Sequence, residues 1–148
     1  MNWTSLDFLV AGLVLLVVSG GALTVVVLVR SAWHRAGLAI AGLTAIALFW
    51  VNGAVGIIGS EANDANALFL GVYGVGALGA LLSHFHARGL TWTLLAMAGV
   101  QALIGLIAWL AGWGADGNAW PRDIALATGL FTAGWLAAAY CFHRATRI

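Results

Sequence analysis

Three polar side chains stand out in an otherwise apolar sequence, because together they could bind a small ligand. Asn52 and Gln101 occur in two similar strings, V51-N-G-A-V-G-I-I-G59 and V100-Q-A-L-I-G-L-I-A108. Glu61 follows the first string in a short polar segment. An amide in an apolar helix needs a partner in protein or water, because hydrocarbon offers none. One interpretation is therefore a polar site of Asn52, Gln101 and Glu61 that lines a path for a small neutral solute.

The small residues around both amides favour a second interpretation. On a helix with about 100° per residue, Asn52 falls among glycines, and Gln101 has the same relation to Gly105. Small residues let two helices approach closely, and an amide at such a contact can donate a hydrogen bond across it. The predicted helix-packing face consists of Gly53, Gly56, Gly59 and Gly105.

The histidines raise the possibility of a haem or metal site. Histidines from different helices can ligate haem iron, and His86 and His143 are the pair to test, because each follows a phenylalanine close to an arginine. His84 and His86 are only two residues apart, so on one helix they would point in nearly opposite directions. All four histidines also lie near arginines, at the predicted depth of the lipid headgroups. Amphipathic cations are favourable there, so the histidines can be explained without a haem or a metal. We therefore expect no cofactor and no metal, with haem as the alternative.

Several function classes lack the residues that they need. Arg122 and Asp123 lie at the start of the fifth predicted span, at its outer edge, and the predicted spans contain no other Asp, Glu, Lys or Arg. The absence of such residues from the membrane interior argues against a proton pump and against most secondary active transporters. There is no Ser/His/Asp set, HExxH pair or phosphate-binding loop, so we expect no enzyme. The net charge of +1 argues against nucleic acid as a partner. The single cysteine, Cys141, cannot form an internal disulfide.

Composition then defines the elements that must position these residues. Only 7% of the 148 residues are charged, against about 25% in a soluble domain, so most of the surface must face lipid. A membrane helix needs about 20 apolar residues. We predict one domain over residues 1–148, an all-α bundle of five transmembrane helices. The predicted spans are 8–29, 36–58, 66–83, 90–111 and 121–142. The third is the shortest, and a four-span alternative would place it in the membrane interface.

Charge also predicts the orientation of the bundle. If the N-terminus lies outside, five of the six arginines fall on the inner side, and the arginine bias of short loops sets topology. We therefore predict an N-out, C-in arrangement. The predicted inner arginines are Arg30, Arg35, Arg88, Arg144 and Arg147. The predicted outer ionised residues are Asp7, Glu61, Asp64, Asp116, Arg122 and Asp123.

Two features suggest internal organisation. The similar strings, and the Phe-His pairs at 85–86 and 142–143, indicate two parallel helical hairpins, 36–88 and 89–147, after an extra first helix. In the outer turn, Gly59 is expected to end the second span, since glycine adopts a positive φ at little cost. Asn63 or Asp64 is expected to cap the third span.

The string W50-V-N-G-A-V-G-I-I-G-S-E61, followed by Asn63 and Asn66, also carries a resemblance. It resembles an uncharacterised group of small proteobacterial inner-membrane proteins with an Asn-Gly-Ala-Val-Gly-Ile-Ile-Gly-Ser-Glu motif. The match is specific over residues 50–66 and looser to about residue 112. The group has a proline in the outer turn, where this chain has Asp64 and Ala65. The resemblance implies a bacterial inner-membrane location and supplies no activity.

Taken together, these patterns favour a non-enzymatic integral membrane protein. We expect it to associate through its Gly/Ala faces, either as a homo-oligomer or as an accessory subunit of a larger membrane complex. The first alternative is a facilitative channel or transporter for a small neutral solute. The second is a haem-binding electron carrier.

Overall fold

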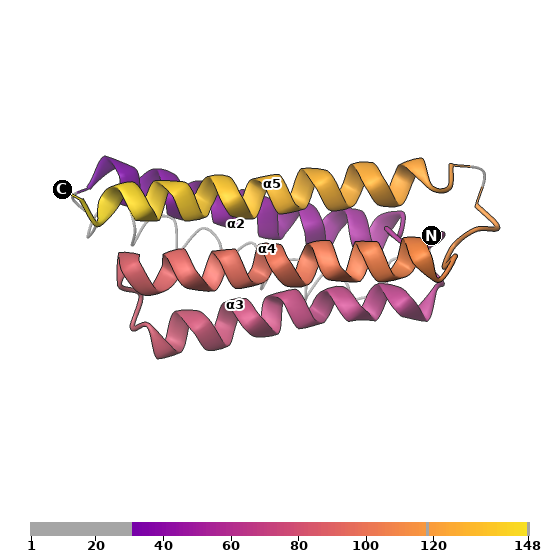
Figure 1. Ribbon diagram of the computed structural model, residues 1–148, viewed down its shortest axis with the longest axis horizontal. Coiled ribbons are helices and arrows are strands. Elements are labelled where there is room, and N and C mark those ends of the chain that lie inside the picture. Colours follow the sequence, from indigo (N-terminus) through magenta and orange to yellow (C-terminus); the bar gives the residue numbers. More distant parts are fainter. Residues whose placement is uncertain (1–30, 118, 148) are drawn as a thin grey trace, which may run out of the picture.

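The computed structural model describes residues 31–117 and 119–147, and this part of the chain contains helices and no strand. Long helical segments lie side by side (Figure 1). The elements are α2 (Ala32–Ala54), the 3-10 helix η1 (Asp64–Phe69), α3 (Leu70–Leu82), α4 (Ala87–Leu110) and α5 (Arg122–Ala145). The predicted first span, 8–29, and Arg30 lie outside the described residues.

The four described helical segments are long and apolar enough to cross a membrane. They contain 23, 19, 24 and 24 residues, with η1 and α3 counted as one segment, Asp64–Leu82. About 20 residues at 1.5 Å each match the thickness of the hydrocarbon core. The all-α prediction is confirmed for the described residues, and the third segment has spanning length. The total of five spans stays a prediction.

The helices pack in a defined order. Helix α5 lies between α2 and α4, and α3 packs against α4. Neighbouring helices are antiparallel, because Gly37 at the start of α2 meets Phe142 at the end of α5, and Gly134 meets Thr44. Helix α3 also reaches α2 through the hydroxyl of Tyr73, which donates a hydrogen bond to the backbone of α2 over 2.8 Å. The result is an up-and-down bundle whose loops alternate between its two ends (Figure 1).

Small residues set the closest contacts between helices. Gly105 of α4 lies against the side chain of Thr128 of α5, and Gly79 of α3 lies against Thr93 of α4. A Cβ atom at either glycine would collide with the threonine side chain. Lipid-embedded helices gain most of their association from this kind of close packing. The sequence therefore uses glycine where two helices must approach.

The charged residues separate to the two ends of the bundle. Helices α2 and α4 begin at the end where α5 finishes, and the acidic residues lie in or next to the loops at the opposite end (Figure 1). This arrangement matches the predicted separation of arginines from acids for the described residues. The arginine-bearing end holds Arg35, Arg88, Arg144 and Arg147, and the acidic end holds Glu61, Asp64, Asp116, Arg122 and Asp123.

The predicted second span, 36–58, extends beyond the C-terminal end of helix α2. Helix α2 ends at Ala54 rather than near residue 58, and the chain turns at Gly56, where φ is +77°. Ile57 and Ile58 then fold inward and are buried. The prediction failed because an unbroken apolar run does not distinguish a helix from a buried loop.

The two similar strings adopt different structures. Residues 100–108 are helical throughout α4, whereas residues 55–59 form a loop after α2. The two predicted hairpins also pack differently. Helices α4 and α5 share the most extensive contact in the described bundle, whereas α2 has its main contact with α5 rather than with α3. Similarity of sequence therefore does not extend to equivalent local structure here.

Candidate functional site

The most elaborate polar arrangement in the described chain is a clamp around Asn66. Its side-chain oxygen accepts hydrogen bonds from the backbone N–H groups of Ile57 and Ile58, at 3.0 and 2.9 Å. Its side-chain nitrogen donates to the carbonyl oxygen of Ser60 at 2.7 Å. Asn66 is 5% exposed, so these bonds are shielded from water. The amide holds the loop after α2 against the start of η1.

Asn52 belongs to the same arrangement. Its side-chain nitrogen donates to the backbone oxygen of Asn66 at 3.1 Å, which ties the last turn of α2 to η1. Its side-chain oxygen is buried and has no hydrogen-bond partner among the described residues. Asn63 caps η1 by accepting from the N–H of Ala65 at 3.0 Å, and it is thus the capping residue of the two predicted candidates, Asn63 and Asp64. The amide of Asn52 thus joins two segments of the turn between α2 and η1, which we call the outer turn after its predicted side of the membrane.

The outer turn packs against a second loop at the same end. Gly59 has φ +74° and Gly114 has φ +79°, a backbone conformation that glycine adopts without cost. A Cβ atom on Gly114 would lie 2.6 Å from the backbone nitrogen of Gly59, so the two backbones touch. The loop after α2 and the loop after α4 therefore form one layer at the acidic end.

The predicted glycine face needs correction at two positions. Gly56 and Gly59 lie in the loop, so they cannot share a helical face with Gly53. Gly53 is exposed, with no described atom within 4 Å of its added Cβ position. Gly105 does lie at a helix contact, against Thr128. These glycines share a face only on a helix that continues beyond Ala54, and α2 ends at that residue.

The three residues of the predicted polar site occupy different surroundings. Glu61 is exposed in the outer turn, and Gln101 is 0% exposed in α4. Neither polar atom of the Gln101 side chain has a hydrogen-bond partner in the described part of the chain. The buried hydroxyls of Thr128 and Thr132 on α5 are unpartnered as well. No hydrogen bond joins Asn52, Glu61 and Gln101 within residues 31–117 and 119–147, and the solute path stays a prediction.

The histidines lie near the arginine-bearing end. Helix α3 ends before His84, which has φ +47°, and His86 precedes α4. The His86 ring nitrogen Nδ1 lies 2.9 Å from the backbone oxygen of Ser83, and His143 lies in the last turn of α5. No group of three or more His, Cys, Asp or Glu residues that could hold a metal occurs in the described residues. Haem ligation by His86 and His143 stays a prediction.

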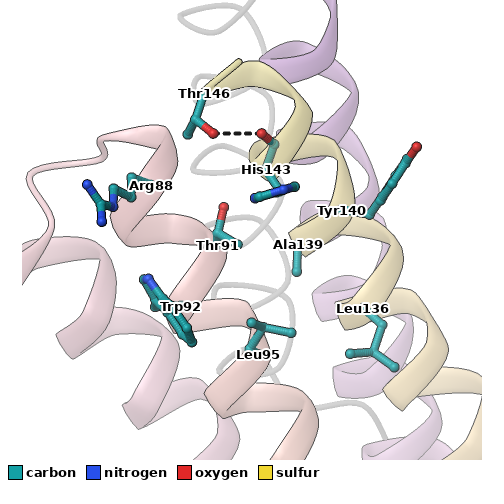
Figure 2. A pocket seen from close by; sticks show the side chains of 9 residues that line it. All are labelled: Arg88, Thr91, Trp92, Leu95, Leu136, Ala139, Tyr140, His143 and Thr146. Carbon is teal, nitrogen blue, oxygen red and sulfur yellow. Dashed lines mark hydrogen bonds between the residues drawn. The ribbon is translucent and has the colours of Figure 1, made fainter.

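His143 lines a groove that the sequence did not indicate. The groove lies between the first turns of α4 and the last turns of α5 and has a volume of about 700 Å³ (Figure 2). Helix α4 contributes Arg88, Thr91, Trp92 and Leu95. Helix α5 contributes Leu136, Ala139, Tyr140 and His143, and the residue that follows this helix, Thr146, completes the lining. His86 is not among the lining residues.

Helix α5 also carries a ridge of small residues that faces away from the other described helices. The outward ridge, as we name it, consists of Gly129, Ala133 and Ala137, all of them exposed. No described atom lies within 4 Å of the Cβ position of Gly129. The spacing of four residues places the three positions on one helical face.

The structural roles of Asn66 and Gly114 were not predicted from the sequence. Asn66 was noted only within the motif, and Gly114 was not singled out. One signal for Asn66 was available, since an asparagine at the start of an apolar segment favours a loop or cap over a helix interior. Comparison of the chain with protein-family models, with curated proteins and with solved structures finds no match.

Proposed function

We propose that this protein is a non-catalytic integral membrane protein that associates with another membrane helix through the outward ridge of α5. The observation that carries the proposal is the exposure of Gly129, Ala133 and Ala137 on a helix of spanning length. Small residues in register every fourth position let a second helix approach the backbone. A partner helix can pack closely against such a ridge, and this close packing favours helix association over contact with lipid.

A second small-residue ridge on the same helix supports this proposal. Gly134 and Ala138 face the bundle interior, where Gly134 lies against Thr44 of α2 and Ala138 is fully buried. Helix α5 therefore already uses one small-residue ridge for close helix contact. Large exposed side chains, Leu126 and Leu130 at 68% and 69% exposure, flank the outward ridge. A partner helix that contacts the ridge would cover them.

The partner that we propose first is α5 of a second copy, which gives a homo-oligomer. An accessory role in a larger complex uses the same ridge against a different chain. We place the protein in a bacterial inner membrane with its arginine-bearing end in the cytosol. The separation of Arg35, Arg88, Arg144 and Arg147 from the acidic residues supports this orientation, because arginine-rich loops stay on the cytoplasmic side.

Replacing Ala133 with leucine should break this association. A leucine side chain would separate the two backbones at the centre of the ridge. We expect the dissociation constant of the oligomer to rise at least about tenfold, which corresponds to ~1.4 kcal/mol. The measurement is the molar mass of the protein in mild detergent, by light scattering over a range of concentrations.

Ala77→Leu is the matched control, because Ala77 is also an exposed alanine, on α3 and away from the ridge. It should leave the oligomer intact. The proposal also holds if another membrane chain copurifies with the protein and Ala133→Leu releases it. It is contradicted by a wild-type monomer that copurifies with nothing from native membranes, or by equal effects of the two substitutions.

A further inference from the structure

The groove between α4 and α5 is a second surface that the proposed association does not use. It begins at the arginine-bearing end, near Arg88 and Thr146, and extends toward Leu95 and Leu136 (Figure 2). From Arg88 to Leu95 the helix rises about 10 Å, at 1.5 Å per residue. A volume of about 700 Å³ lies within the range of roughly 300–1,000 Å³ that is usual for small-molecule sites.

The entrance of the groove favours an anion. Arg88 lines one wall and His143 the other, and Arg88 makes no ion pair within the described residues. The two threonine hydroxyls that line the groove donate to backbone oxygens of nearby residues, Thr91 to the oxygen of Ala87 at 2.9 Å and Thr146 to that of His143 at 2.7 Å. The guanidinium of Arg88 and the imidazole of His143 therefore remain as donors for a ligand, beside the indole N–H of Trp92 and the hydroxyl of Tyr140. The described acidic residues all lie at the opposite end of the bundle.

The deeper part of the groove favours a hydrocarbon chain. Leu95, Leu136 and Ala139 line it, and no charged side chain does so beyond the entrance (Figure 2). Trp92 and Tyr140 are 67% and 53% exposed beside the entrance, and their amphipathic rings are suited to the headgroup region. A free anion would use the entrance alone. A molecule with a phosphate at one end and an acyl chain at the other would contact the whole groove.

We propose that this groove binds an anionic phospholipid, with the phosphate at the end that carries Arg88 and His143 and one acyl chain along Leu95, Leu136 and Ala139. Basic pockets between membrane helices are a known means of binding anionic headgroups. The proposal is independent of self-association, because its residues differ from those of the outward ridge.

Native mass spectrometry of the full chain tests the proposal. The protein is equilibrated with equal amounts of phosphatidylglycerol and phosphatidylcholine that carry identical acyl chains. We expect phosphatidylglycerol to be retained in preference. Arg88→Ala should lower its retention about fivefold, the effect usual for one Lys or Arg at an anionic membrane surface. His143→Ala should also lower its retention, through loss of a hydrogen-bond donor. Both positions are exposed, and an unchanged melting temperature will show that the variants fold.

Arg147→Ala is the matched control, since Arg147 lies at the same end of the bundle but outside the groove. It should change retention less than twofold. An equal loss with Arg147→Ala would show general surface attraction and overturn the proposal. Equal retention of both lipids would overturn it as well. Displacement of the lipid by millimolar glycerol phosphate would overturn the proposal and assign the groove to a soluble anion. Absence of lipid from the homo-oligomer, with lipid bound to the monomer, would overturn it as well and assign the groove to a second copy of the chain.

Discussion

Replacing Asn66 with leucine is expected to lower the free energy of unfolding by about 3–5 kcal/mol. The substitution preserves much of the side-chain volume but removes the hydrogen bonds to the N–H groups of Ile57 and Ile58 and to the oxygen of Ser60. Each buried backbone group that loses its partner costs about 1–3 kcal/mol. Because Asn66 is buried, water cannot readily replace the lost bonds.

Unfolding in increasing dodecyl sulfate, followed by circular dichroism, measures this loss. Asn63→Ala is the control, because Asn63 lies in the same turn but makes one capping bond, to the N–H of Ala65. Loss of a helix cap costs about 1 kcal/mol. If Asn66→Leu is no more destabilising than Asn63→Ala, the clamp does not hold the outer turn.

Replacing Gly114 with alanine is the second substitution with a large expected effect. A Cβ atom at this position would lie 2.6 Å from the nitrogen of Gly59 and 2.8 Å from its Cα atom. The positive φ of Gly114 costs an alanine about 1–2 kcal/mol, and overpacking typically adds about 1–3 kcal/mol. We therefore expect a total destabilisation of about 2–5 kcal/mol, because the obstructing atoms belong to the backbone.

Gly112→Ala separates the two contributions. Gly112 has a similar positive φ, +67°, but no described atom lies within 4 Å of its added Cβ position. Its substitution should cost only the conformational part, about 1–2 kcal/mol. The same unfolding measurement compares the two variants. Equal destabilisation would mean that the loops after α2 and α4 do not depend on their close contact.

The helices could be predicted because the chain contains few charged residues, and these lie mainly between the apolar stretches. Long stretches without Asp, Glu, Lys or Arg lie between short loops, and lipid leaves only helices or closed barrels as spanning structures. The described helices α4 and α5 begin and end within a few residues of the predicted spans. A cap at Asn63 or Asp64 was also predicted, because local hydrogen bonds of such residues depend on only a few neighbours, and Asn63 is the cap.

The outer turn could not be derived in the same way. Ile57 and Ile58 are apolar, so they read as a continuation of the helix, although they are buried in a loop. What ends the helix there is a long-range interaction, since Asn66 lies eight and nine residues from the N–H groups that it accepts. The contact of Gly59 with Gly114 joins two separate loops. Helical periodicity contains no information on either interaction.

Gln101 shows a related limit. The sequence identifies an amide among small residues, and burial at 0% exposure fits either interpretation of that pattern. The packing interpretation expects a hydrogen bond across the helix contact, yet neither polar atom of the side chain has a partner among the described residues. Which helix packs beside Gln101 depends on tertiary structure. Here α4, which contains Gln101, packs on α5 and α3, whereas α2 packs mainly on α5.

The proposed protein is a lipid-embedded bundle whose arginine-bearing end faces the cytosol, and site-directed labelling tests this orientation directly. In a Cys141→Ser background, Glu61→Cys and His86→Cys place single thiols at exposed positions at opposite ends of the bundle. Spheroplasts are treated with a membrane-impermeant maleimide before and after lysis. We predict that Glu61→Cys reacts in intact spheroplasts and that His86→Cys reacts only after lysis. Reaction of His86→Cys before lysis, with or without that of Glu61→Cys, would contradict the account.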